Sequence, residues 1–310
     1  MEALLEEYGI VLTPYRTTAE YDVLAGAFVD DTDRNLMFRI YVPSGHVFAD
    51  ESDTLMRLFR EWLAQIGHLS IRQDGYKTGA GQVFEFFGDG GPLRGHLAHE
   101  MDEFADFISA CMNDPGTAAR ELRARGIEEA VADRFITRFA RDGNRLQLDL
   151  RHTRERRLLD LRQLFEAGIL ELGSAPAQGA TAALEAASQL NPFRSLVAPP
   201  SVLGASGSVV NIGAQSTINV YNAISANLTG VDGLSDEGRA LLELIARSNS
   251  ADAAEFTTAV HEPEDAEAHH TDRLKARQRL KGFLIRVGHT MKDPSIAILQ
   301  KYVEKKMGLV

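Results

Sequence analysis

The sequence predicts an α+β protein with four parts: a small N-terminal ββαββ domain, a helical middle region, an uncharged β segment and a C-terminal helical domain. Three observations lead to this prediction. Strand-type alternation and helical spacing follow one another within residues 1–92. Helical spacing then dominates residues 93–172 and 232–310. Between Arg194 and Asp232 there is no charged residue.

Composition sets outer limits on the interpretation. The 310 residues carry a formal net charge of −11, and a chain of this length usually forms two or three compact units. The single cysteine, Cys111, excludes an internal disulfide and a cysteine-rich zinc site, and it fits a reducing compartment. The first residues do not resemble a secretory signal, and no apolar run is long enough for a transmembrane helix. We therefore expect a cytoplasmic protein.

The first domain, residues 1–92, has the pattern of two antiparallel hairpins around one helix. The expected strands are residues 21–29, 36–42, 69–76 and 82–87. Polar turn residues separate the first two strands, and a turn containing two glycines separates the last two. A helix is expected after Asp50, because the apolar residues from Leu55 to Ile66 recur on one helical face.

The middle region, residues 93–172, is expected to pack on this domain as helices. The expected helices are residues 93–112, 117–125, 127–141 and 151–171. Glycine and proline mark the breaks, and the pair Asp142-Gly143 ends the third helix in this interpretation. Residues 145–150 alternate briefly, which is typical of a short strand.

An uncharged stretch follows, and it divides into a linker and a β segment. Residues 173–207 are rich in Ala, Gly, Ser and Pro, which is typical of a flexible linker. Residues 208–231 alternate apolar with polar, uncharged side chains, as an amphipathic strand does. The apolar positions expected to mediate oligomerisation are Val210, Ile212, Ile218, Val220, Ile224 and Leu228.

Such a strand is not stable alone, so the β segment 208–231 needs a partner. It can pair within its own chain, pair with copies in a homo-oligomer, or enter a membrane as a hairpin after assembly. The natural turn positions, Gly213-Ala214-Gln215 and Asn222-Ala223, leave arms shorter than the roughly 9–11 residues that a spanning strand needs. The leading hypothesis is therefore a non-enzymatic, self-assembling interaction or regulatory protein, and a pore-forming effector ranks second.

Two basic stretches support a third hypothesis, a nucleic-acid-binding component. Residues 120–162 contain twelve arginines and no lysine, although acidic residues share the interval. Residues 273–286 contain six cations and no acidic residue. The residues expected to bind an anion or a protein partner at the C-terminal helical domain are Arg273, Lys275, Arg277, Arg279 and Lys281. A solvated basic helix face explains the same pattern.

One loose metal pattern occurs, and no catalytic motif does. The residues with metal-ligand spacing on one helical face are His96, His99, Glu100 and Glu103. An exposed polar helix face is the simpler interpretation. The sequence lacks a phosphate loop, a dinucleotide fingerprint and a serine-nucleophile elbow, so we expect no cofactor and no catalytic residue.

Overall fold

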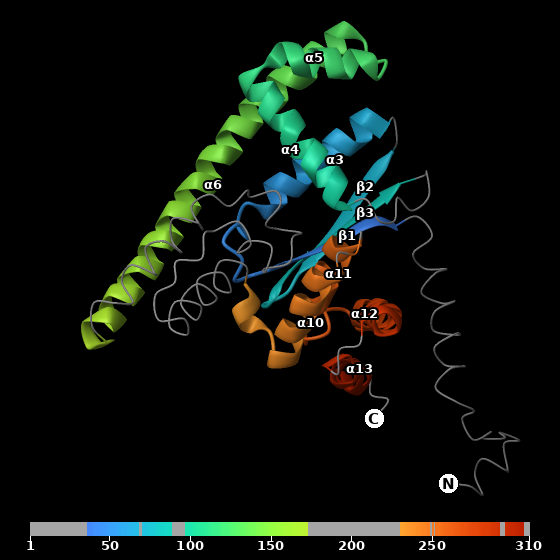
Figure 1. The fold of residues 1–310 in the computed structure, drawn as a ribbon. Helices are drawn as coiled ribbons and strands as arrows, with labels where there is room; N and C mark the ends of the chain where they lie inside the picture. Colours follow the sequence, from blue (N-terminus) through green and yellow to red (C-terminus); the bar gives the residue numbers. More distant parts are fainter. Residues whose placement is uncertain are drawn as a thin grey trace, which may run out of the picture. The chain divides into compact units, whose positions relative to one another are not determined.

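The structure is a computed structural model that describes residues 36–67, 70–88, 97–172, 230–248, 250, 252–291 and 295–306. These residues fall within one structural unit, Asn35–Val310, and they confirm the α+β class (Figure 1). The expected strand 21–29, the linker 173–207 and the β segment up to residue 229 lie outside the described residues.

An antiparallel three-stranded sheet lies at the centre of the described structure. Its strands are β1 (Leu36–Pro43), β2 (Ile71–Lys77) and β3 (Gly81–Gly88), in the order β1-β3-β2. The hairpin between β2 and β3 was expected, and its turn is closed by a hydrogen bond from the Thr78 N–H to the Gly81 carbonyl. β1 is buried on both faces. Its alternate residues Met37, Arg39 and Tyr41 are also buried, because a C-terminal helix covers that face.

The other face of the sheet packs on α3 (Ser52–Gly67), the helix expected after Asp50. Its apolar stripe is buried, with Phe59 and Trp62 fully enclosed. Phe59 contacts Phe86 of β3 edge to face, with ring centroids 5.5 Å apart. Burial of aromatic side chains of this size is a major source of stability. The first hydrophobic core therefore forms between the sheet and α3.

The middle region forms α4 (Leu97–Asn113), α5 (Pro115–Ala124) and α6 (Glu129–Leu172). Asp114 caps α5 by accepting a hydrogen bond from the Thr117 N–H at 3.2 Å. These helices extend the first core and enclose Cys111, which has no exposed surface.

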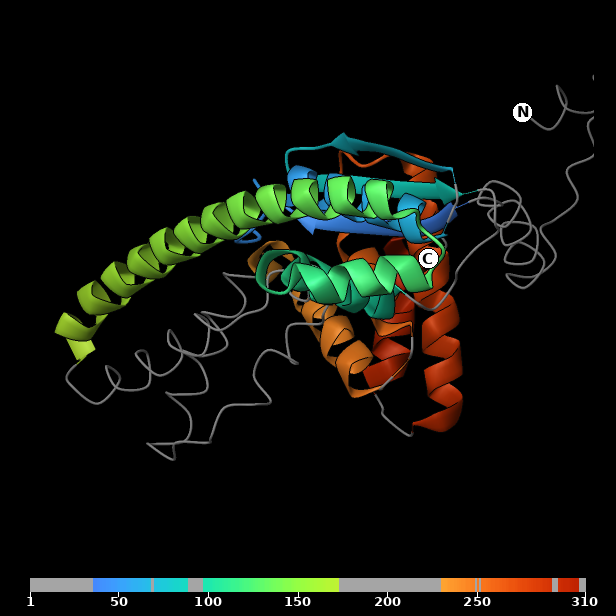
Figure 2. The same cartoon turned by 90° about the horizontal axis from the view of Figure 1, so that it is seen from above.

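The expected break at Asp142-Gly143 and the expected strand 145–150 are wrong. α6 runs through both as a single, gently curved helix (Figure 2). Gly143 allows close packing instead, because a Cβ there would lie 3.0 Å from Ile108 Cγ2 of α4. The apparent strand alternation includes Leu146 and Leu150, which are four residues apart and are both buried on one helical face.

The C-terminal region forms a short 3-10 helix and four α-helices. They are η2 (Val231–Gly233), α10 (Asp236–Arg247), α11 (Ala253–His261), α12 (His270–Thr290) and α13 (Ser295–Lys306). The expected β segment therefore ends earlier than residue 231, because Val231 begins η2.

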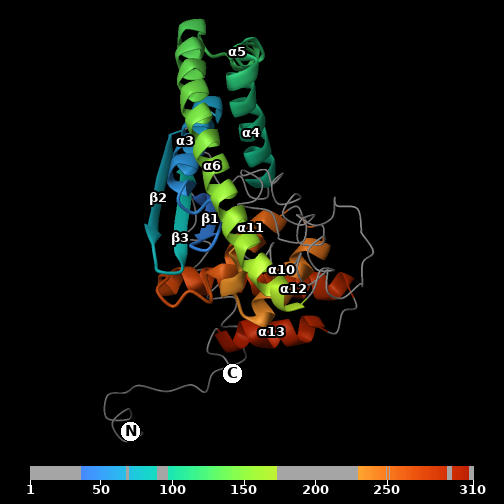
Figure 3. The same cartoon turned by 90° about the vertical axis from the view of Figure 1, so that its left-hand side faces the viewer.

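A second hydrophobic core lies among these C-terminal helices, with Leu241, Phe283 and Leu284 at its centre. α11 packs directly against β1. α5 and α13 lie at opposite ends of the described structure (Figures 1 and 3). The C-terminal helices thus cover the sheet face that α3 leaves open.

Candidate functional site

A buried cluster of charged side chains joins the sheet to the C-terminal helices. We call Arg39, Glu85, Glu262 and Asp272 the polar seam. Arg39 Nε donates to Glu262 Oε1 at 2.9 Å, and its Nη2 lies 3.0 Å from Asp272 Oδ2. Its Nη1 donates to Glu85 of the neighbouring strand. All these side chains are at least four-fifths shielded from solvent, so the contacts occur where water screens them little.

Charge balance in the polar seam determines the direction of each pKa shift. Burial alone would lower the pKa of Arg39, but the facing carboxylates outweigh it and raise that pKa. Burial raises the pKa of Glu262 despite Arg39. At Asp272, burial would raise the pKa, but Arg39 together with Tyr76 and Lys275 outweighs it and lowers the pKa. Lys275 and Arg279 of α12 add cations that act on Asp272 and Glu262. Three cations thus face three carboxylates.

Hydroxyl groups of β1 and of the β2–β3 hairpin extend the polar seam. Tyr41 and Thr78 both donate to Asp265 Oδ2, at 2.8 and 2.6 Å. Tyr76 donates to Asp272 at 2.9 Å. The acidic stretch 262–272 therefore fastens the hairpin to the C-terminal helices.

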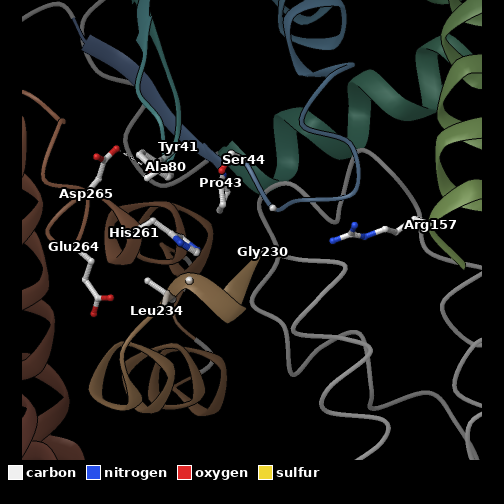
Figure 4. A pocket seen from close by; sticks show the side chains of 12 residues that line it. Tyr41, Pro43, Ser44, Ala80, Arg157, Gly230, Leu234, His261, Glu264 and Asp265 are labelled. Carbon is white, nitrogen blue, oxygen red and sulfur yellow. Dashed lines mark hydrogen bonds between the residues drawn. The ribbon is translucent and has the colours of Figure 1, made fainter. Parts of the chain in front are cut away.

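A cleft opens beside this seam, between the loop after β1, η2, the end of α11 and α6 (Figure 4). Its volume is about 310 Å³, and we call it the Arg157–His261 cleft after the two side chains that reach it from α6 and α11. A smaller cavity of about 170 Å³ adjoins it, lined by Arg156, Asp160 and the loop that starts at Ser44. The two cavities share Ser44, Gly45 and Arg157.

His261 forms part of the cleft wall. Its ring stacks on Tyr41 with an interplanar angle of 3° and a centroid distance of 5.7 Å. Burial lowers the pKa of His261 to about 4, so the imidazole is neutral at pH 7. Neither ring nitrogen hydrogen-bonds to any residue in the described ranges. His261 is partly exposed where it lines the cleft, so its ring nitrogens are accessible to water or to a ligand.

Arg157 reaches the cleft from α6, and no acidic side chain of the described residues pairs with it. The two carboxylates on the opposite wall have other partners. Glu264 accepts from the Ser235 N–H at 2.8 Å and from Tyr302, while Asp265 binds the hairpin hydroxyls. Figure 4 shows both acids at the end of the cleft away from Arg157.

Most of the predicted anion-binding residues on α12 interact with carboxylates of the same chain. Lys275 and Arg279 act on the polar seam, and Lys281 lies 3.6 Å from Glu304 of α13. Arg273 and Arg277 are neighbours one turn apart. Burial, and then the charge of Arg273, lowers the pKa of Arg277.

The arginines of residues 120–162 that lie on α6 form mostly local pairs. Arg138 contacts Glu61 of α3 at 2.9 Å, which joins two helices. Arg145 and Arg151 each face an acid four residues later, at 4.0 Å. Exposed pairs of this kind contribute little to stability.

Among the predicted metal ligands that the structure describes, His99 and Glu103 take part in ion pairs. His99 Nε2 lies 3.3 Å from Glu103 Oε1, and Arg125 lies 3.5 Å from the other oxygen of Glu103. Glu100 is on the same helix, and His96 lies outside the described residues. Within the described ranges, no three His, Cys, Asp or Glu side chains are grouped to hold a metal ion.

The predicted oligomerisation residues, Val210 to Leu228, also lie outside the described residues. None of the described helices combines the length and apolarity needed to cross a membrane. No protein family model matches the sequence, no curated protein matches it, and no solved structure matches its fold. The functional argument therefore depends on the geometry of this chain.

Proposed function

We propose that this chain is a non-enzymatic, self-assembling interaction protein of the cytoplasm, in which copies associate through residues 208–229. The observation that carries the proposal is the anchor that follows this segment. Gly230 has a left-handed backbone with φ of 72°, and a Cβ there would lie 2.8 Å from the His46 nitrogen. Only glycine fits such a position without strain.

Burial continues on the C-terminal side of this anchor. Val231 and Leu234 are 6% and 5% exposed, and both belong to the second core. The segment therefore joins the folded body at a fixed point directly after Thr229. A strand that pairs with another copy needs such a fixed attachment to the folded body, because a mobile attachment would add to the entropy lost on association.

The polar seam supports the same proposal. It ties the sheet to the C-terminal helices, and the residues that follow the anchor, Val231 and Leu234, pack into the core of those same helices. The uncharged alternation of residues 208–229 supplies an apolar face and no charge to oppose self-pairing.

The test is the mass of the full chain in solution by light scattering coupled to size exclusion. Ile212→Asp combined with Ile218→Asp places charge on the apolar face of the segment. Asn211→Asp combined with Asn219→Asp adds the same charge to the polar face and is the matched control. We expect the first variant to dissociate to a lower mass and the control to keep the oligomer.

A monomeric wild-type protein, or equal behaviour of the two variants, would contradict assembly through this face. Dye release from anionic liposomes separates the pore alternative. Release that depends on Ile212 and Ile218 would favour membrane insertion over pairing in water. Cell fractionation tests the cytoplasmic assignment.

A further inference from the structure

The Arg157–His261 cleft brings together two side chains whose polar groups make no hydrogen bond or ion pair with other described residues. Arg157 has no acidic partner among the described residues, and the imidazole of His261 makes no hydrogen bond to them. They line one cavity from opposite walls (Figure 4). A cation with no acidic partner among the described residues and an imidazole with accessible ring nitrogens, both lining one cavity, are features of binding sites more than of structural cores.

We propose that this cleft binds a small aromatic anion, whose carboxylate or phosphate group pairs with Arg157 and whose ring lies against His261. This inference is independent of assembly through residues 208–229, because it depends only on residues that the structure describes.

The wall of the cleft fits the apolar part of such a ligand. Pro43, Ala80 and Leu234 contribute aliphatic surface beside the stacked pair of Tyr41 and His261. At about 310 Å³ the cavity lies at the lower end of the size range of small-molecule sites, so it suits a ligand with one ring.

Charge determines which end of the ligand faces which wall. Glu264 and Asp265 would repel an anion, but both already accept several hydrogen bonds and lie away from Arg157. A guanidinium binds a carboxylate or phosphate through two parallel hydrogen bonds, which a single point charge does not provide. The anionic group is therefore expected at the α6 side of the cleft, with the ring toward α11.

His261 is the second residue that selects the ligand. Because the ring is neutral at pH 7, it offers one N–H donor and one acceptor nitrogen rather than a charge. A ligand bearing a ring hydroxyl can satisfy either nitrogen. The aromatic ring of the ligand can also extend the stack that His261 forms with Tyr41.

The test titrates the full-length protein with three probes: phenyl phosphate, inorganic phosphate and phenol. Phenyl phosphate carries both the ring and the charge, inorganic phosphate carries the charge alone, and phenol carries the ring alone. Binding is measured by calorimetry, and contact is measured by the NMR shift of the His261 ring proton, assigned with His261→Gln. We expect phenyl phosphate to bind at least about tenfold more tightly than either fragment and to move the His261 signal.

The matched variants are Arg157→Gln and Arg145→Gln, both on α6. Arg145 is 86% exposed and faces Asp149, outside the cleft. We expect Arg157→Gln to weaken phenyl phosphate binding by about tenfold or more and Arg145→Gln to leave it unchanged. An unmoved His261 signal, equal affinity for inorganic phosphate, or equal loss in both variants would overturn the proposal. The NMR measurement on the wild-type protein keeps the test decisive if a variant misfolds.

Discussion

Arg39 and Glu262 are 223 positions apart in the sequence, yet Arg39 Nε lies 2.9 Å from Glu262 Oε1. Both are almost completely buried, at 5% and 2% exposure. Their contact joins the sheet to the C-terminal helices, and the charge on each compensates the cost of burying the other.

Removing the Arg39 charge should therefore destabilise the fold strongly. Arg39→Met leaves the carboxylates of Glu85, Glu262 and Asp272 facing one another, and we expect the free energy of unfolding to fall by about 3–5 kcal/mol. Urea unfolding followed by the fluorescence of Trp62, the single tryptophan, measures this. Arg72→Met removes an exposed ion pair with Asp74 and should cost less than about 1 kcal/mol. Equal losses would show that the seam contributes no more than a surface pair.

Stability should depend on pH through His261. Burial lowers its pKa from an ordinary 6.5 to about 4, so between these pH values the unfolded chain binds more protons than the folded chain. The free energy of unfolding should therefore fall as pH drops from 6.5 to 4, by up to about 3 kcal/mol from this group.

Urea unfolding at several pH values, compared between variants, isolates that contribution. His261→Gln should flatten the pH dependence in this window. His99→Gln, which changes an exposed histidine of α4, should leave it unchanged. An identical slope for wild-type protein and His261→Gln would contradict the assigned pKa.

Gly143 should be intolerant of larger side chains. A Cβ there meets Ile108 Cγ2 at 3.0 Å and Met112 Sδ at 3.3 Å, so Gly143→Val should push α4 and α6 apart and cost about 1–3 kcal/mol. Gly282 of α12 is the matched control, because nothing lies within 4 Å of its Cβ position. Gly282→Ala should stabilise by about 0.5–1 kcal/mol through helix propensity. Thermal unfolding of the two variants tests the contrast, and a stabilising Gly143→Val would refute the packing role.

Gly230 should also be intolerant of a larger side chain. Gly230→Ala forces a left-handed backbone on alanine and places its Cβ 2.8 Å from Pro43 Cβ, so a loss of about 2 kcal/mol is expected. Gly233→Ala, at the end of the short helix that Gly230 precedes and with open space at its Cβ, should be nearly neutral. Hydrogen exchange at the Leu234 amide, which bonds to the Val231 carbonyl, reports the local effect. Unchanged protection in Gly230→Ala would argue against a fixed anchor.

Local elements of the fold were predictable because their signals are local. The β2–β3 hairpin has alternating strands with a short turn between them, and the helix after Asp50 shows a continuous apolar stripe. The helix break expected at Gly143 was wrong for the opposite reason. The role of Gly143 depends on Ile108 of another helix, and no pattern near residue 143 reveals that neighbour.

The candidate site was missed because it is assembled from distant parts. Arg39 occupies a polar position of an alternating strand, which normally faces water, and its partners Glu262 and Asp272 belong to no sequence motif. The one available signal was complementary charge, a lone arginine in a strand and an acidic run elsewhere. His261 and Arg157 belong to no motif, and only the fold places them on one cavity.

The reactivity of Cys111 can be used to measure the opening of the first hydrophobic core. Its thiol has no exposed surface, and burial raises its pKa to about 12, so very little reactive thiolate exists at neutral pH. Alkylating reagents should reach it only when α4 separates from the helices packed against it, chiefly α5 and α6. Because no second cysteine competes in the chain, the labelling rate reports on opening of that core without any added probe, through the population of the open state when reclosing is faster than alkylation.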